Sequence, residues 1–358
     1  MSASDATDTE TMRSPCQLPS NLVSYFTQAL KTFQLSGTTF TVLCSVSSPS
    51  ASASATTHSN NGTQVAAPIQ PKQAPRALVV LDSSFNPPTL AHQRMALSAL
   101  ADQPKQQQNA TPRDSRVLLL LAINNADKAP KPAAFPQRLA MMYVFAQDLL
   151  SAARRQRNRH LHPEAAVPDP GSGMGAGAEE EDVVDIAVTT EPYFHSKSNA
   201  IATSEFYSGA AAATAAATAG EGVMMEQMYL TGFDTLIRIL DAKYYPNDTM
   251  RQALDPFLSQ SRLRVTMRTD ADWGTAADQR AYLAGLRGGK LKAMGGRREW
   301  ADKVEMVEGR REGKGEDVIS STKVRAAVQS EDWQALRRLV SDGVGEWVKT
   351  QGLYKEEV

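Results

Sequence analysis

Thr89 and His92 are the side chains whose types and spacing best suit chemistry on an anion. They stand at the start of the predicted helix 90–100, after an apolar run at 77–81 that predicts a buried strand. Residues three apart share one helix face, so both side chains can point at the same anion. A strand, a tight loop and a helix N-terminus together present backbone N–H groups to phosphate. The segment therefore predicts a phosphate-binding loop, with ordinary helix capping as the alternative.

A second cluster of this kind lies near the end of the chain, at 319–325. Ser320, Ser321 and Thr322 place successive hydroxyls at a predicted helix N-terminus, where the amides and the helix dipole attract anions. Arg325 follows one turn later with a planar guanidinium that suits phosphate oxygens. The cluster predicts a polyphosphate cradle; the alternative is a helix cap beside a surface arginine.

Runs that predict strands alternate with helical segments along most of the chain. The predicted strands are 39–46, 77–81, 117–123, 183–188, 228–231 and 263–267, and the predicted helices include 18–33, 90–100, 137–150 and 198–207. Such alternation predicts an α/β fold, a Rossmann-like doubly wound parallel sheet with helices on both faces. Ligands of these sheets bind at the carboxyl ends of the strands, where the loop with Thr89 and His92 is expected.

The chain is expected to form one domain from 19 to 358, after a disordered N-terminus at 1–18. Four stretches of low-complexity, glycine-rich or charge-rich composition are interpreted as inserts within it. They lie at 47–75, 168–181, 210–222 and 286–316.

Charge and composition exclude several classes of protein. With 358 residues and a formal net charge of -1, the chain has no global basic field to recruit nucleic acid. Its two cysteines, Cys16 and Cys44, are too few for a disulfide framework or a metal-ligand cluster, so no metal-binding residue is predicted. So few cysteines also favour a reducing compartment, and the cytoplasm or the nucleus is expected. No apolar run approaches the ~20 residues that a membrane span needs. No feature of the sequence indicates an oligomeric state.

The segment 83–92 resembles the nucleotidylyltransferase superfamily signature Gly-x-Phe-x-Pro-x-Thr-x-x-His, with Ser83 where the family has glycine. The hydroxyls before Arg325 resemble the other superfamily hallmark, Ser-Ser-Thr-x-x-Arg. The resemblance runs from about 76 to 354 and points to the fungal-type branch of the nicotinamide and nicotinate mononucleotide adenylyltransferases. It implies that Thr89, His92 and Arg325 are catalytic and that ATP phosphates are bound by Ser83, Ser84, Phe85, Asn86, Ser320, Ser321 and Thr322.

The same resemblance implies where the acceptor nucleotide binds. Gly232 and Asp234, at the end of a predicted strand, resemble the Gly-x-Asp element that holds the acceptor, and such a carboxylate can accept hydrogen bonds from ribose hydroxyls. Lys128 and Arg138 match the part of the family that contacts substrate phosphate.

The implied reaction moves AMP from ATP to nicotinamide mononucleotide, giving NAD and pyrophosphate, with Mg²⁺ accompanying the ATP. Nicotinamide-type members usually place a tryptophan after the Gly-x-Asp helix to stack on the pyridine ring, whereas this chain has Tyr244 and Tyr245 there and Trp273 later. Two alternatives stay open: a phosphopantetheine-type adenylyltransferase, which shares the Thr-x-x-His form, and a non-catalytic nucleotide-binding adaptor on the same fold. The sequence does not choose between the nicotinamide and nicotinate acceptors.

Overall fold

The computed structural model describes residues 18–47, 64–72, 75–106, 115–124, 133–161, 182–208, 225–268, 273–309 and 319–355. Its strands are β1 (Phe40–Ser47), β2 (Ala77–Asp82), β3 (Ser115–Ala122), β4 (Val183–Thr189), β5 (Glu226–Gly232), β6 (Ser261–Thr266) and β7 (Val304–Val307). Its α-helices are α1 (Leu22–Ser36), α2 (Leu90–Gln106), α3 (Phe135–Leu161), α4 (Phe194–Ala202), α6 (Phe233–Ile239), α7 (Met250–Gln260), α8 (Ala276–Gly285), α9 (Leu291–Ala293), α10 (Ser321–Gln329), α11 (Trp333–Leu339) and α12 (Asp342–Thr350).

The strands form one sheet in the order β1-β4-β3-β2-β5-β6-β7. All pairs from β4 to β7 are parallel, and β1 is added antiparallel to β4 at the edge. The chain runs outward from β2 to β4 in one direction and from β5 to β7 in the other. The two directions separate between β2 and β5, which is where parallel α/β sheets bind ligands.

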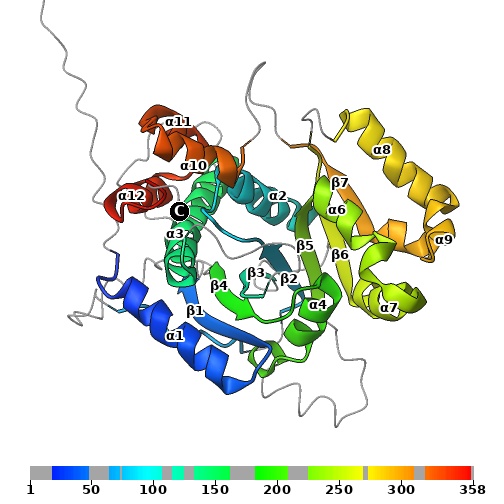
Figure 1. Cartoon of the computed structure of the whole chain (residues 1–358), viewed down its shortest axis with the longest axis horizontal. Coiled ribbons are helices and arrows are strands. Elements are labelled where there is room, and N and C mark those ends of the chain that lie inside the picture. The colour runs from blue at the N-terminus through cyan, green and yellow to red at the C-terminus, as the bar shows by residue number, and fades with distance from the viewer. Residues whose placement is uncertain are drawn as a thin grey trace, which may run out of the picture.

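Each face of this sheet carries its own hydrophobic core. Side chains alternate along a strand, so Val79 and Leu81 of β2 face one core while Leu78 and Val80 face the other. The first core includes residues of α1, α3, α10 and α12, and the second includes residues of α4, α6 and α7. Figure 1 shows these two helical layers around the curved sheet. The expected doubly wound α/β fold is confirmed, with the antiparallel edge strand as an addition.

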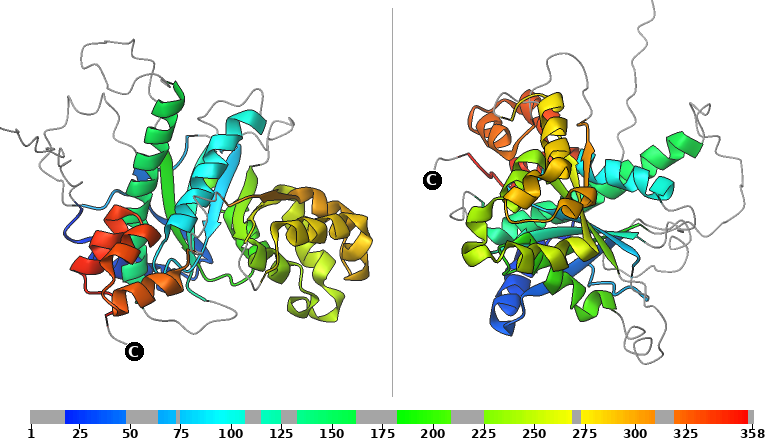
Figure 2. Two further views of the ribbon diagram at one scale, coloured as in Figure 1. Left: turned by 90° about the horizontal axis from the view of Figure 1, so that it is seen from above. Right: turned by 90° about the vertical axis from the view of Figure 1, so that its right-hand side faces the viewer.

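The helices near the C-terminus lie far in sequence from β2 but close to its flanking helices. Figure 2 shows α10 to α12 gathered beside α2 and α3, while α6 to α9 lie at the other end of the sheet. The last part of the chain is thereby placed near the loop that leaves β2.

Two of the expected inserts need correction. The stretch 286–307 was predicted to belong to an insert, but it is part of the folded core. Within it β7 pairs with β6, and the side chains of Leu286, Leu291 and Trp300 are buried. A few widely spaced apolar residues cover the sheet edge there, although glycine and charged residues dominate the composition. Within 47–75, Val65 is buried and the backbone N–H of Ile69 donates to Ser45 Oγ, so 64–72 lies against β1. The expected inserts at 168–181 and 210–222, and residues 1–17, lie outside the described residues.

Candidate active site

The loop after β2 is held in an unusual backbone conformation. Phe85 has a φ of 45°, which a bulky side chain seldom adopts, and its side chain is fully buried. The ring lies 5.5 Å from the His92 ring and 6.5 Å from that of Phe145 on α3. Such strained backbone persists where the surrounding packing fixes it, and it clusters at binding and catalytic sites.

His92 lies in the first turn of α2 with a hydrogen bond at each ring nitrogen. The backbone N–H of Thr89 donates to Nδ1 over 2.9 Å, and Nε2 lies 3.0 Å from Ser83 Oγ. Burial lowers the pKa of the imidazole from 6.5 to about 4. The ring is therefore neutral near pH 7, and it is held in one orientation at the carboxyl end of β2.

Thr89 shares a helix face with His92, as expected, but the two side chains meet each other. The Thr89 side chain is buried, and its Oγ1 lies 2.9 Å from His92 Nδ1. In this geometry Thr89 orients the imidazole. A direct contact between Thr89 and phosphate stays a prediction.

The helix α10 packs on the same loop. Ser321 Oγ donates to the Pro87 carbonyl over 2.8 Å, and Arg325 Nη1 donates to the Asn86 carbonyl over 2.9 Å. Arg325 Nη2 also donates to Thr322 Oγ1 over 3.2 Å. The two anion-suited segments, more than 230 positions apart in sequence, therefore meet in one place. Ser320 caps the helix by accepting from the Lys323 N–H, so capping and phosphate binding are compatible at this N-terminus.

The C-terminal tail contacts the loop within the first core. Tyr354 Oη donates to Asn86 Oδ1 over 2.8 Å, and both side chains are buried. Arg138 of α3 is also buried; its Nε donates to the Ala133 carbonyl, and its guanidinium lies 5.0 Å from the Phe135 ring. Burial lowers the pKa of Arg138, the nearby Tyr354 raises it, and the charge of Arg325 lowers it further. Arg138 thus lies near Tyr354 and Arg325, and its expected acceptor contact stays a prediction, whereas Lys128 lies outside the described residues.

The end of β5 carries the expected glycine and carboxylate. Gly232 precedes α6, and a Cβ built there would lie 2.6 Å from Asp234 Oδ1, so a side chain at this position would displace the Asp234 carboxylate. Asp234 Oδ1 lies 3.4 Å from Arg268 Nη1, at the end of the neighbouring strand β6. Sequence reasoning missed Arg268, because only the pairing of β5 with β6 shows that it lies beside Asp234.

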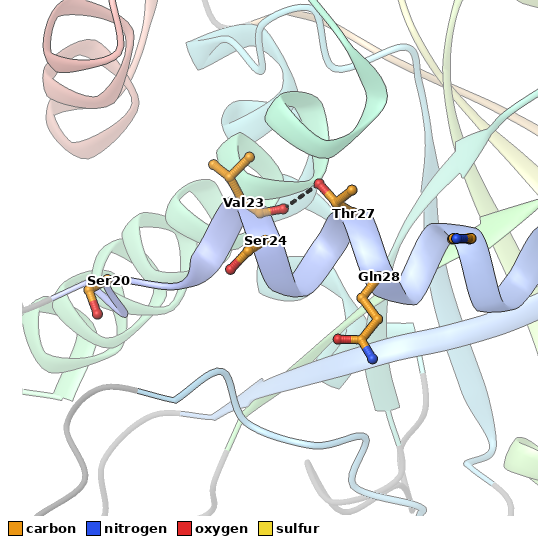
Figure 3. A pocket seen from close by; sticks show the side chains of 6 residues that line it. Ser20, Val23, Ser24, Thr27 and Gln28 are labelled. Atoms are coloured by element: carbon orange, nitrogen blue, oxygen red, sulfur yellow. Dashed lines mark hydrogen bonds between the residues drawn. The ribbon is translucent and has the colours of Figure 1, made fainter.

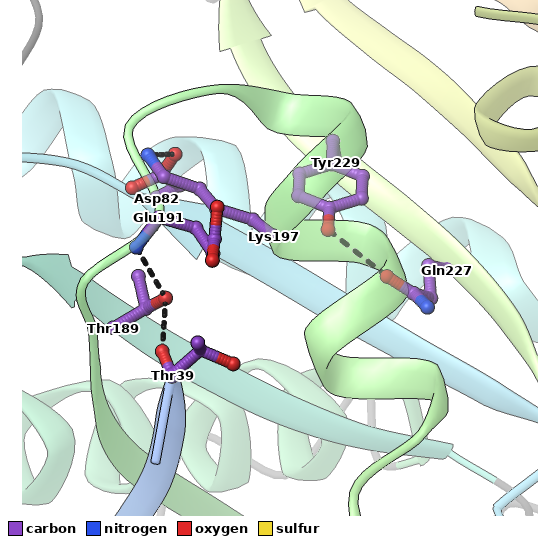
Figure 4. A network of polar contacts seen from close by, with 7 residues as sticks. All are labelled: Thr39, Asp82, Thr189, Glu191, Lys197, Gln227 and Tyr229. Carbon is purple, nitrogen blue, oxygen red and sulfur yellow. Dashed lines mark hydrogen bonds and ion pairs between the residues drawn. The ribbon is translucent and has the colours of Figure 1, made fainter. Parts of the chain in front are cut away.

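A buried ion pair, also missed from the sequence, ties α4 to the end of β2. Lys197 Nζ lies 2.5 Å from Asp82 Oδ2, and the two side chains are only 6% and 7% exposed. Figure 4 shows Lys197 extending from α4 toward Asp82, with Tyr229 of β5 near by. The hydroxyl of Tyr229 donates to Gln227 Oε1, and burial, followed by the charge of Asp82, raises the pKa of this tyrosine. Asp82 precedes Ser83, so the pair fixes the point where the loop leaves the sheet.

Aromatic side chains gather where α4 begins and where α6 ends. The rings of Tyr193 and His195 stack 5.6 Å apart, and Tyr193 lies 6.4 Å from Tyr244. His195 also lies 5.9 Å from Tyr245, and burial lowers its pKa. Tyr193 is 38% exposed, so this cluster presents an aromatic surface to solvent. Sequence reasoning noted Tyr244 and Tyr245, but Tyr193 joins them only through the tertiary fold.

An open hollow elsewhere on the surface is not part of this site. It has a volume of about 690 Å³ along α1 and is lined by Ser20, Val23, Ser24, Thr27, Gln28 and Lys31 (Figure 3). Lys31 is its one charged lining residue, so the hollow offers no group of catalytic side chains.

Within the described ranges no three or more His, Cys, Asp or Glu side chains gather to hold a metal ion. None of the helices in those ranges is both long and apolar enough to cross a membrane.

The parallel sheet, the loop at its switch point and the helix N-terminus that packs on that loop define a nucleotidylyltransferase-like α/β protein. Over 280 residues the chain is 30% identical to a Schizosaccharomyces pombe protein named "Putative nicotinamide mononucleotide adenylyltransferase", covering 78% of this chain and 87% of that protein. The chain therefore belongs to the nicotinamide/nicotinate mononucleotide adenylyltransferase family.

More distant likenesses are found among solved structures. The Plasmodium falciparum nicotinic acid mononucleotide adenylyltransferase, solved with NaAD and with APC, is 11% and 10% identical. The alignments cover 79% of this chain and 98% of that one, at a TM-score of 0.38. No protein-family model matches the chain.

Proposed function

We propose that this protein transfers the adenylyl group of ATP to nicotinamide mononucleotide, forming NAD and pyrophosphate. The observation that carries the proposal is the contact of Arg325 and Ser321 with the carbonyls of Asn86 and Pro87. It brings two helix N-terminal regions with anion-binding chemistry to one place, as a bound triphosphate requires. The name of the S. pombe relative supports the nicotinamide acceptor.

The chemical step needs little beyond alignment and charge stabilisation. An oxygen of the acceptor phosphate attacks the α-phosphorus of ATP, the bond from that phosphorus to the α,β-bridging oxygen breaks, and pyrophosphate leaves. The acceptor phosphate is already an anion near neutral pH, so the step needs no strong base. Positioning and preorganised hydrogen-bond donors supply the catalysis of such reactions.

Side chains at the loop and at α10 divide this work. His92, neutral and oriented by Thr89, contributes to the hydrogen bonding that stabilises charge on the α-phosphate. Ser321, Thr322 and Arg325 hold the β- and γ-phosphates and steady the leaving pyrophosphate. The remaining loop contacts come from Ser83, Ser84, Phe85 and Asn86 on one side and from Ser320 on the other.

Mg²⁺ is expected to enter with ATP, bound mainly by phosphate oxygens and water. The nearby carboxylates of Asp82 and Asp234 are paired with Lys197 and Arg268. That arrangement fits a nucleotide-borne ion, because Mg²⁺ keeps several waters and needs few protein ligands. The bound ion would neutralise phosphate charge.

The acceptor nucleotide is assigned to the carboxyl end of β5 and the N-terminus of α4. Asp234 can accept hydrogen bonds from ribose hydroxyls, and the exposed ring of Tyr193 beside Tyr244 can stack on a flat heterocycle. In this arrangement Tyr193 would do the stacking that nicotinamide-type members usually assign to a tryptophan after the Gly-x-Asp helix. Residues Lys128 and Arg138 remain candidates for the acceptor phosphate. The cytoplasm or the nucleus remains the expected compartment.

Incubation of the purified protein with Mg-ATP and a panel of acceptors tests the proposal. We expect NAD and pyrophosphate to form in equal amounts from nicotinamide mononucleotide, with lower rates from nicotinate mononucleotide and none from phosphopantetheine. The His92→Ala variant should turn over ~10²-fold more slowly while keeping its fold, as for the loss of one oxyanion donor. Transfer to phosphopantetheine would favour that class of enzyme, and nucleotide binding without turnover on any acceptor would favour the adaptor.

A further inference from the structure

The hydrogen bond between Ser83 and His92 has a defined direction. A backbone N–H can only donate, so the Thr89 N–H that reaches His92 Nδ1 over 2.9 Å requires a lone pair on Nδ1. A neutral imidazole then carries its proton on Nε2. The 3.0 Å contact is therefore a bond from His92 Nε2–H to Ser83 Oγ.

The Ser83 hydroxyl keeps a proton of its own. Among the described residues, His92 is the one hydrogen-bonding partner of Oγ. Ser83 is half-buried at the carboxyl end of β2, next to the exposed Ser84, so part of this residue faces solvent at the end of the sheet where ligands bind. A hydroxyl that accepts one hydrogen bond becomes a better donor for the next, because linked hydrogen bonds polarise one another.

The imidazole itself is less free to reach a ligand. Its Nδ1 is held by Thr89 and its Nε2 by Ser83, and its ring packs 5.5 Å from that of Phe85. To touch phosphate directly, Nε2–H would have to leave Ser83, whereas the Ser83 hydroxyl needs only a rotation about its C–O bond.

We propose that Ser83 is a catalytic residue whose hydroxyl donates to an oxygen of the α-phosphate of ATP, with His92 acting through it. This inference rests on the proposed adenylyl transfer. Both protons stay on their own atoms: Nε2–H donates to Oγ, and Oγ–H donates to the phosphoryl oxygen. Both bonds strengthen as negative charge grows on that oxygen. His92 is then a positioning residue for Ser83, and Thr89 is one for His92.

Steady-state kinetics of single and double variants test this pair. We expect Ser83→Ala and His92→Gln each to lower kcat by ~10²-fold, with the KM for ATP changed little. Because the two residues act as one unit, the double variant should be no slower than the slower single variant. Ser83→Thr keeps a hydroxyl and should recover most of the activity. Ser259→Ala, which removes a similar hydroxyl on α7, is the matched control and should leave kcat unchanged.

Two results would overturn the inference while leaving adenylyl transfer intact. One is a Ser83→Ala variant as active as the wild type, which would mean that His92 reaches the phosphate itself. The other is a double variant whose loss is the product of the single losses, which would mean that the residues act separately. A wild-type protein without turnover on any acceptor would instead refute the adenylyl transfer, and this inference with it.

The imidazole can also be observed without catalysis. The chain has five histidines, few enough to resolve by side-chain ¹⁵N NMR, and the His92 signals are assigned by their loss in His92→Gln. We expect the Nε2–H tautomer at pH 7, and a shift of its Nε2 signal on addition of Mg-ATP that is absent in Ser83→Ala. An Nδ1–H tautomer would refute the proposed direction of the bond.

Discussion

At the scale of single residues, the site uses small polar groups whose orientation is fixed by neighbours. His92 is neutral because burial lowers its pKa to about 4, and its tautomer is fixed by a backbone N–H. Arg325 is proposed to bind phosphate oxygens through its guanidinium. Its Nη1 also donates to the Asn86 carbonyl, so the same side chain holds the loop in place. The orientation of each of these side chains therefore depends on one or two hydrogen bonds.

The partly buried imidazole makes stability depend on pH. Between pH 6.5 and about 4, the unfolded chain binds a proton at His92 that the folded chain does not, so the free energy of unfolding falls as pH falls. Above pH 6.5 both states are neutral, and the contribution is fully present. Urea denaturation at pH 7 and pH 5 should show a larger loss of stability for the wild type than for His92→Gln. Equal losses would show that His92 titrates normally in the folded protein.

At the scale of elements, the site is built where strands end and helices begin. The loop after β2 is held by α10 through Ser321 and Arg325, by the C-terminal tail through Tyr354, and by α4 through the Asp82–Lys197 pair. Three elements that are distant in sequence thus fix one loop.

The Asp82–Lys197 pair should be strongly coupled. Because both side chains are buried, Asp82→Leu or Lys197→Met alone leaves one charge without its partner and should cost about 3–5 kcal/mol of stability. The double variant leaves neither charge and should lose less than either single variant. A double-mutant cycle by urea denaturation measures this coupling. Arg280→Met, which breaks an exposed pair with Glu308, should change stability by less than about 1 kcal/mol. Additive losses at 82 and 197 would contradict the pairing.

The tail should matter for ATP binding through one hydroxyl. Tyr354→Phe removes the donor to Asn86 Oδ1, and should cost about 1–2 kcal/mol of stability and raise the KM for ATP, because Asn86 belongs to the loop. Tyr25→Phe removes a comparable bond to the Leu43 carbonyl, remote from the loop, and serves as the matched control. It should lower stability similarly without changing the KM. Equal KM values for all three proteins would show that the tail does not orient the loop.

At the scale of the whole molecule, the sheet topology brings the site together. The strand order changes direction between β2 and β5, so the loop after β2 and the Gly232–Asp234 turn lie at neighbouring strand ends. A ligand that bridges the loop and α10 would link segments more than 230 positions apart in the chain.

Binding of Mg-ATP should therefore stabilise the entire fold. A ligand at a hundred times its Kd adds about 2.7 kcal/mol to the free energy of unfolding, which a thermal shift assay detects as a higher Tm. Arg325→Ala should reduce this shift at the same ligand concentration, whereas Arg297→Ala, at an exposed pair with Asp255, should leave it intact. An undiminished shift in Arg325→Ala would place the triphosphate elsewhere.

The sequence alone determined the local chemistry and the class of fold. Apolar runs of strand length alternate with helical patterns, so the class of fold was predictable from neighbouring residues. The two segments proposed to bind phosphate carry fixed residue types at short spacings, so the sequence also marked them as candidates. The stretch 286–307 was predicted to be an insert, but it packs on the edge of the sheet. Its few buried apolar residues are too widely spaced to form a local pattern that the sequence would show.

Only the tertiary structure decided which distant residues meet. The pairing of Lys197 with Asp82, of Arg268 with Asp234 and of Tyr354 with Asn86 joins residues 34 to 268 positions apart, and no local pattern encodes such contacts. The direction of the Ser83–His92 bond also required coordinates, since it follows from a backbone N–H placed by the turn before α2. Short-range preferences of the chain specify elements and motifs, whereas the packing of helices on both faces of a sheet specifies their contacts.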